Sequence, residues 1–196
     1  MRPFSKAVST LTGLVGTAAL LLGSATLAHA TIISYSATLS GPNESPANAS
    51  PGTGNATAVY DDVAHTLTVH VDFTGLTGTT TASHIHAPTA VAGVSTASVA
   101  TTTPTFAGFP LGVTAGTYDN VLDLTLASSY NPSFVSGNGG TTASAEAALV
   151  AAIAAGKAYL NVHSQTFPGG EIRGFLAPTP TPTDIQTWGY IKASRR

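Results

Sequence analysis

Cysteine is absent from this chain of 196 residues, and charged residues make up only 8% of it. Without cysteine, neither a disulfide framework nor thiolate chemistry is available. Stability must therefore come from apolar burial, backbone pairing or a bound ion. The seven lysines and arginines form no cluster outside the last five residues, and nine acidic residues outnumber them. Because nucleic-acid binding requires a basic face, we expect no nucleic-acid partner.

The first thirty residues have the pattern of an export signal. Arg2 and Lys6 make a basic start, the run LTGLVGTAALLLGSATLA is apolar, and AHA at 28–30 is a small-x-small cleavage site. Residues 1–30 are therefore predicted to be a signal peptide, which places the mature chain in the periplasm or cell envelope, or outside the cell. A membrane anchor is the alternative. Glycines and threonines in the run and the cleavage site after it argue against one, so we expect no membrane span in the mature chain.

Short strand signals recur through the rest of the chain. Leu67, Val69, Val71 and Phe73 alternate with polar residues, as in a strand with one buried face. Similar segments, separated by Gly, Pro, Asn and Asp, cover 31–41, 54–62, 65–76, 81–88, 95–101, 116–127, 157–164 and 170–176. This spacing predicts one mainly β domain, an antiparallel sandwich or barrel.

One helix interrupts the strands, and a proline-rich tail follows them. Residues 141–157 combine a Thr/Ser start, an alanine-rich body and a stop at Gly156, so we expect a short helix across one end of the sandwich. Residues 177–196, APTPTPTDIQTWGYIKASRR, are predicted to be a flexible, extended Pro/Thr-rich tail.

Three histidines are candidate metal ligands. His84 and His86 are two apart on a predicted strand, so both rings lie on one face while Ile85 faces the core. His163 lies on another predicted strand, in YLNVHS. If the two strands are neighbours, three neutral imidazoles converge, a donor set that suits copper, with zinc as the alternative. A solvated or hydrogen-bonded pair of histidines is the other interpretation of His-x-His.

Several motifs resemble the CHRD domain, a module repeated in chordin and common in secreted bacterial proteins. They are HIHAP, AYLNVHSQTFPGGEIRGFL and the opening YSATLSGPNESPANASPGTGNATAVYD, which together span roughly residues 34–176. The resemblance implies an immunoglobulin-like Greek-key β-sandwich over residues 31–176 and, more loosely, a kinship with copper–zinc superoxide dismutases. By this kinship His84, His86 and His163 fall on three copper ligands, and Arg173 falls near an anion-guiding arginine. The zinc site is missing, because no His, Asp, Glu or Cys lies between His86 and Thr117.

The segment FPGGEIRG has a structural interpretation of its own. Gly169 and Gly170 permit a tight turn or bulge before the last strand. Glu171 and Arg173, two apart, are expected to share one face and to order the site, by orienting an imidazole or by fixing the loop. A direct role of Arg173 toward a substrate is the alternative.

The other polar candidates are interpreted as solvated. His65 falls in a predicted turn and His70 on the polar face of its strand. Four aspartates are expected on turns and strand surfaces as solvated carboxylates: Asp61, Asp62, Asp119 and Asp123. The alternative is that two of them pair as the general acid and base of a glycosidase.

The sequence thus predicts a secreted, non-enzymatic interaction or structural module with one copper ion and an extracellular protein or surface partner of unknown identity. Two alternatives stay open: a copper-dependent, superoxide dismutase-like redox enzyme, and an exported copper-storage or delivery protein.

Overall fold

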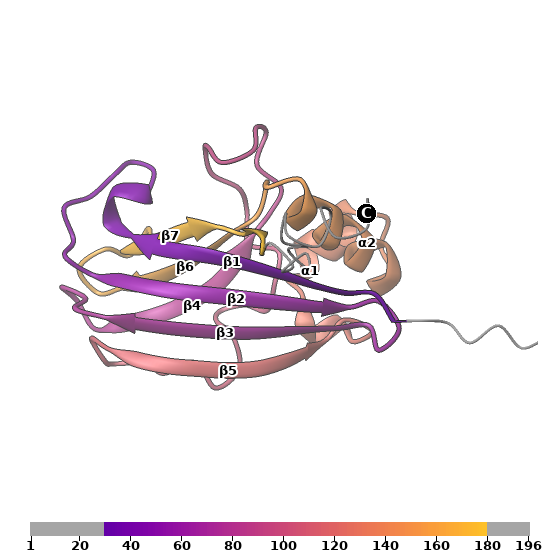
Figure 1. Ribbon diagram of the computed structural model, residues 1–196, viewed down its shortest axis with the longest axis horizontal. Helices are drawn as coiled ribbons and strands as arrows, with labels where there is room; N and C mark the ends of the chain where they lie inside the picture. Colours follow the sequence, from indigo (N-terminus) through magenta and orange to yellow (C-terminus); the bar gives the residue numbers. More distant parts are fainter. Residues whose placement is uncertain (1–29, 180–196) are drawn as a thin grey trace, which may run out of the picture.

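The strands follow the alternating segments of the sequence and pair into one curled antiparallel sheet. The computed structural model describes residues 30–179. Its strands are β1 Ile32–Ser40, β2 Thr53–Asp61, β3 Thr66–Thr74, β4 Thr80–His86, β5 Gly116–Asp123, β6 Tyr159–Ser164, β7 Ile172–Phe175 and β8 Ala177–Pro178. Their order is β4-β6-β7-β1-β2-β3-β5, and β8 pairs with β1. In Figure 1 the strands β1, β2, β3 and β5 form a front layer, with β4, β6 and β7 behind it. The predicted antiparallel β-sandwich is confirmed.

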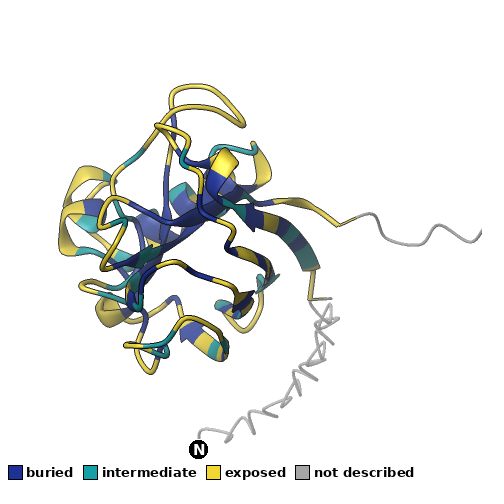
Figure 2. Ribbon diagram, turned by 90° about the vertical axis from the view of Figure 1, so that its left-hand side faces the viewer, coloured by how far each residue is buried: buried dark blue, intermediate teal, exposed yellow. Residues whose placement is uncertain are grey.

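The core lies between the two layers. Leu67, Val69 and Val71 of β3 are fully buried, and so are Ile85 of β4 and Leu160 of β6. Burying one such side chain contributes about 1.5–3 kcal/mol. Figure 2 shows buried residues along the strands in the interior and exposed residues in the surrounding loops. The alternation read from the sequence therefore correctly separates the core face from the solvent face.

Aromatic side chains close the sandwich between its two edge strands, β4 and β5. Phe106 lies in the long segment after β4, where its backbone N–H donates to the Ser83 carbonyl. Its ring stacks on Tyr118 of β5 at 5.5 Å between ring centroids. Phe109 packs against Tyr118 at 5.4 Å and against Phe73 of β3 at 5.6 Å. These rings join the edges that the strand pairing leaves apart.

The predicted helix is α2, Thr142–Ala154, and its ends follow the capping signals in the sequence. The Thr141 side chain accepts from the N–H of Ser144, whose side chain in turn accepts from the Thr141 N–H. At the other end Gly156 has φ +64°, and Lys157 N–H donates to Ala152 O, which ends the helix in a Schellman turn. A second, six-residue helix, α1 Pro132–Gly137, is not predicted. Both helices lie at one end of the sheet (Figure 1).

Two segments differ from their prediction. The segment 95–101 forms no strand of its own. It runs along the free edge of β4 and makes isolated bridges, His86 with Val99 and Thr101 with Tyr130. The predicted tail begins later than residue 177, because β8 pairs with β1 and Thr179 N–H donates to Ser34 O.

The predicted signal peptide and the rest of the tail lie outside the described residues. No helix within residues 30–179 is long and apolar enough to cross a membrane.

Candidate metal centre

The pairing of β4 with β6 brings the three histidines together. The two strands are antiparallel neighbours, with Ala82 opposite His163, His84 opposite Asn161 and His86 opposite Tyr159. Alternate residues of these strands, such as Ile85, belong to the core. The histidines therefore occupy the face of the layer that is turned away from the core.

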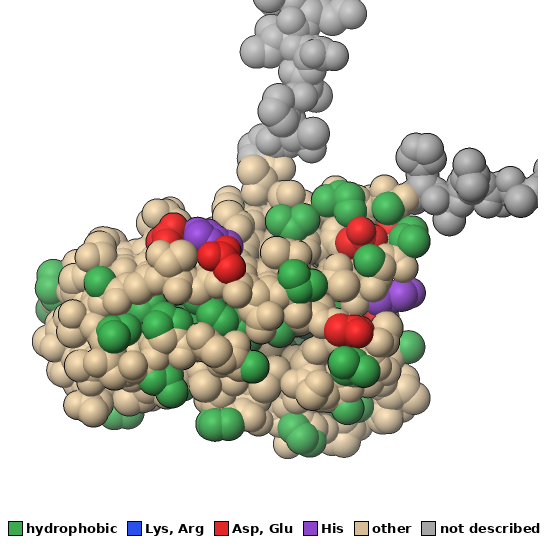
Figure 3. Space-filling model, turned by 90° about the horizontal axis from the view of Figure 1, so that it is seen from below, with side chains coloured by type: hydrophobic (Ala, Val, Ile, Leu, Met, Phe, Trp, Pro, Cys, Tyr) green, Lys and Arg blue, Asp and Glu red, His purple; other side chains and the backbone are tan. Residues whose placement is uncertain are grey.

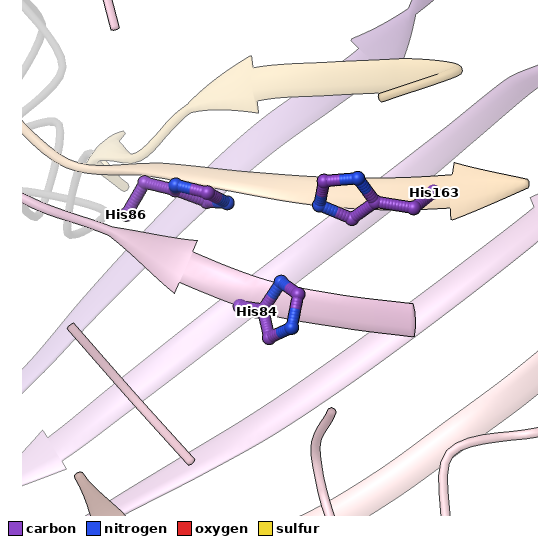
Figure 4. A group of neighbouring side chains, drawn as sticks. All are labelled: His84, His86 and His163. Carbon is purple, nitrogen blue, oxygen red and sulfur yellow. The ribbon is translucent and has the colours of Figure 1, made fainter. Parts of the chain in front are cut away.

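One ring nitrogen from each histidine can serve the same ion. These ligand atoms of His84, His86 and His163 all lie within 4.8 Å of one another. The ring centroids are 5.1 Å apart for His84–His163, 5.6 Å for His84–His86 and 5.9 Å for His86–His163 (Figure 4). Nitrogens at about 2.0 Å from one ion are roughly 3.5 Å apart, so side-chain shifts on the order of 1 Å would complete the site. The predicted convergence of the three residues is confirmed.

Backbone carbonyls fix the orientation of every ring. The bonds are His84 Nε2 to Pro104 O at 2.5 Å, His86 Nδ1 to Ala97 O at 2.9 Å and His163 Nδ1 to Pro168 O at 2.9 Å. A carbonyl only accepts, so each bonded nitrogen carries the proton and the other nitrogen of the ring keeps a lone pair. These other nitrogens, His84 Nδ1, His86 Nε2 and His163 Nε2, are buried and have no hydrogen-bond partner among residues 30–179. Carbonyl-held imidazoles with free lone pairs are typical of metal sites.

Burial also keeps the imidazoles neutral. It lowers the pKa of His84 and of His163, and it lowers the pKa of His86 to about 4. Hydrogen bonds to the carbonyls oppose this effect only partly. At neutral pH a metal ion would therefore not compete with protons for these nitrogens.

Tyr159 and Arg173 form a stack beside His86. The Tyr159 ring is parallel to His86, with centroids 4.8 Å apart and 5° between the planes. The Arg173 guanidinium lies 4.7 Å from the centroid of the same tyrosine ring. The stack restricts the His86 ring, and Tyr159 is a neighbour of the centre that sequence reasoning missed.

Arg173 is buried, and two of its guanidinium nitrogens donate to backbone carbonyls. Its side chain is 4% exposed. Nε donates to Asn43 O at 2.5 Å and lies 3.8 Å from Glu44 Oε2, while Nη1 donates to Ser95 O at 3.0 Å. The guanidinium therefore ties two loops to β7. A residue that guides anions from solvent would need an exposed guanidinium.

Glu171 orders a different set of loops. Its fully buried carboxylate accepts from Ser50 Oγ at 2.6 Å, from Thr77 N–H and from Gly78 N–H at 3.2 Å. Burial by itself raises its pKa, but hydrogen bonds from Ser164, Ser50, Thr77 and Gly78 outweigh burial and hold the pKa below its ordinary value. Of the two expected ordering roles, these contacts match the fixing of a loop, since none of them is to an imidazole.

The turn before β7 depends on Gly170. Its N–H donates to Phe167 O at 3.0 Å, and its φ of +134° favours glycine. A Cβ here would lie 2.5 Å from Asn161 Nδ2 and 2.7 Å from Glu44 Oε1. At Gly169 a Cβ would meet no atom of the described residues within 4 Å. The turn also contains Pro168, whose carbonyl holds His163.

Within residues 30–179 two further histidines, His65 and His70, lie away from the cluster. His65 contacts the carboxylate of Glu146 on α2 at 2.9 Å. His70 lies between Asp119 at 2.7 Å and Asp72 at 2.8 Å on the outer face of the sheet. Figure 3 shows acidic side chains beside histidines and, among the described residues, no lysine or arginine on the face in view. These groups match the expectation of polar residues at the surface.

Asp61, Asp62 and Asp123 each accept a hydrogen bond from a backbone N–H group. Asp61 accepts from the N–H groups of Val63 and Ala64 in the hairpin turn, and Asp62 accepts from Thr31 N–H. Asp123 accepts from the N–H and hydroxyl of Thr125. These contacts match the expectation of solvated carboxylates on turns and strand surfaces.

Comparison with known families gives one result. The CHRD domain matches residues 35–176, well over half of the chain. The chain belongs to the CHRD domain family. CHRD domains are extracellular interaction modules. The match spans all three histidines, the Gly170 turn and Arg173. Searches of curated proteins and of solved structures gave no match.

Proposed function

We propose that this CHRD domain is a secreted, non-enzymatic interaction module that holds one copper ion between His84, His86 and His163. The three buried, unpartnered and convergent ring nitrogens carry the proposal. Leaving such atoms without a partner costs free energy, and a bound cation would offset that cost. The export signal predicted at residues 1–30 supports secretion.

The donor set favours copper over zinc. Among divalent first-row metals, copper binds nitrogen ligands most tightly. Structural zinc sites almost always have four protein ligands. The candidate group found within residues 30–179 has three, all of them histidines. When bound, copper would supply a redox-active centre and a cross-link between β4 and β6. The buried, engaged guanidinium of Arg173 favours this binding role over the dismutase-like alternative.

The test is metal analysis of protein purified from its natural export route. We expect one copper per chain in the wild type. We expect none in a His84→Ala, His86→Ala, His163→Ala triple variant, and unchanged copper in a His70→Ala control. Added copper should raise the thermal midpoint of the wild type and of the control only, because a ligand that binds the folded state stabilises it. Equal copper in the triple variant and the wild type would refute the proposal.

A further inference from the structure

Two buried oxygen atoms next to the histidine cluster also lack a hydrogen-bond partner. Within residues 30–179, five buried side-chain polar atoms have no hydrogen-bond partner. Three are the histidine nitrogens of the centre, and the other two are Glu44 Oε1 and Asn161 Oδ1. Asn161 links the two groups, since it is opposite His84 in the β4–β6 ladder and its Nδ2 donates to Glu44 Oε2 at 3.4 Å. The unpartnered atoms therefore gather in one region of the molecule.

The two oxygens lie close together against the Gly170 turn. Both are within 2.8 Å of the point where a Cβ of Gly170 would stand. Glu44 is 8% exposed and Asn161 is 2% exposed. Since Gly170 leaves no room for a side chain here, the carboxyl and the amide face each other in a confined space.

A carboxylate and an amide cannot satisfy each other in this arrangement. An ionised carboxylate only accepts, while an amide has one donating and one accepting side. When Asn161 Nδ2 donates to one carboxyl oxygen, Asn161 Oδ1 is left beside the other. Reversing the amide by exchanging its O and N only changes which carboxyl oxygen faces the amide oxygen. A proton on Glu44 that donates to Asn161 Oδ1 satisfies both atoms.

We propose that Glu44 is a protonated acid paired with Asn161, and that its proton is released when the neighbouring histidine cluster takes up a metal ion. The first part stands on the geometry of the pair, and the second rests on the proposed function. In the described part of the chain, Glu44 has its hydrogen bond with Asn161 and its ion pair with Arg173, and neither involves a histidine of the cluster.

The surroundings of Glu44 support a retained proton. Burial raises the pKa of Glu44 to about 7, while Arg173, the Ser45 N–H and the Asn161 amide oppose burial only in part. Arg173 is the cation facing the carboxyl, at 3.8 Å, and it donates to backbone carbonyls as well. The other titratable group nearby, Tyr159 on β6, has its pKa raised by burial, so its hydroxyl is neutral here.

Solvent reaches this region through a surface pocket of about 350 Å³. Loops 44–48 and 166–170 line it, and Glu44 and Gly170 are among its residues. A proton leaving Glu44 can therefore pass to water without crossing the core.

Metal binding is expected to drive this release. A cation placed one side chain away favours the ionised carboxylate, so it lowers the pKa of Glu44. The three unpartnered ring nitrogens that would bind the ion carry no proton, because the proton of each ring is on the nitrogen bonded to a carbonyl. The proton balance is simple: Glu44 O–H gives its proton to water in the pocket, and the carboxylate that remains offsets part of the added charge.

The experiment measures protons released when Zn(II), a redox-inert probe, is added to metal-free protein near pH 7. Wild type is expected to release about half a proton more than Glu44→Gln, because a group with a pKa near 7 is about half protonated there. The glutamine can donate to Asn161 as the acid does, so this variant should fold and bind one metal. An Asp119→Asn control, on the opposite layer, should release as many protons as the wild type. Equal release from wild type and Glu44→Gln, with both binding metal, would overturn the coupling.

A second measurement separates the two parts of the proposal. Isotope-edited NMR or infrared titration of the metal-free protein should show one carboxyl titrating near pH 7, and Glu44→Gln should remove it. If this titration is present but no metal binds, the proposed function fails and the acid–amide pair stands. If Glu44 titrates in the ordinary range of a glutamate, the pair is refuted whether or not metal binds.

Discussion

Replacing Glu171 with glutamine is expected to lower the free energy of unfolding by about 3 kcal/mol. In the folded protein the carboxylate accepts from Ser50 Oγ, Thr77 N–H and Gly78 N–H. Glutamine keeps one acceptor and turns an NH₂ group toward these donors. At least one buried donor then loses its acceptor, which costs about 1–3 kcal/mol, and the charge-assisted bonds, worth about 1.5–3 kcal/mol each, weaken to neutral ones.

Urea denaturation followed by far-ultraviolet circular dichroism measures this change. The control is Asp119→Asn, which also removes one negative charge but at a side chain that is 72% exposed. It should stay within about 1 kcal/mol of wild type, because an exposed ion pair such as that with His70 contributes about 1 kcal/mol at most. A Glu171→Gln variant as stable as this control would refute the reasoning.

The effect of Glu171 should also depend on pH in a defined direction. Its pKa is lower in the folded protein than the ordinary value of 4.5. The ionised carboxylate therefore stabilises the fold above pH 4.5, and this contribution is lost as the pH falls through the folded pKa. The difference in stability between wild type and Glu171→Gln should accordingly narrow in acid. A difference that widens in acid would contradict the role assigned to the carboxylate.

Three further predictions follow from the packing and the surface ion pairs. Gly170→Ala should destabilise the fold by about 2 kcal/mol or more in urea, because it adds a Cβ at a positive φ against buried polar atoms, whereas Gly169→Ala should be close to neutral. Phe106→Ala should cost about 3–5 kcal/mol by the same assay, since the ring is fully buried between the sheet edges; a loss below about 1 kcal/mol would mean that the edges close without it. Two aspartates raise the pKa of His70 above 6.5, so its contribution to stability should be present below pH 6.5 and lost as the pH rises through the folded pKa. Thermal midpoints of His70→Asn and wild type should therefore converge at alkaline pH, and a gap that grows there would contradict this.

The strands and α2 were predictable because their signals are local. Alternating apolar residues define β3, and β2 before it ends at Asp61, which accepts from the N–H groups of the hairpin turn. Thr141 and Gly156 mark the ends of α2 by their capping chemistry. Each signal lies within a few residues of the structure that it specifies.

The candidate site was predictable only in part. The spacing of His84 and His86 indicates a shared face, and the resemblance to known motifs pointed to His163. The carbonyls of Ala97 and Pro104, which orient two rings, come from a segment that forms no regular strand. Backbone contacts of this kind leave no pattern in the side-chain sequence.

The contact between Glu44 and Asn161 could not be predicted from the sequence either. They are 117 positions apart in the chain, and no periodicity connects them. The sequence does single out Glu44 in two ways. It is one of only nine acidic residues, and it lies in the opening motif that resembles the CHRD domain. An isolated carboxyl in a loop of small and proline residues is a reason to look for a buried partner.

The strand β1 of the front layer joins this layer to the other one. It pairs with β2 along its whole length, and its other side adjoins β7 and β8. Neither layer therefore exists as a separate unit that could open while the other stays intact. Amide hydrogen exchange should find the slowest protons of the two layers released in a single global event, and a nick within Ile32–Ser40 should expose the entire domain to proteases.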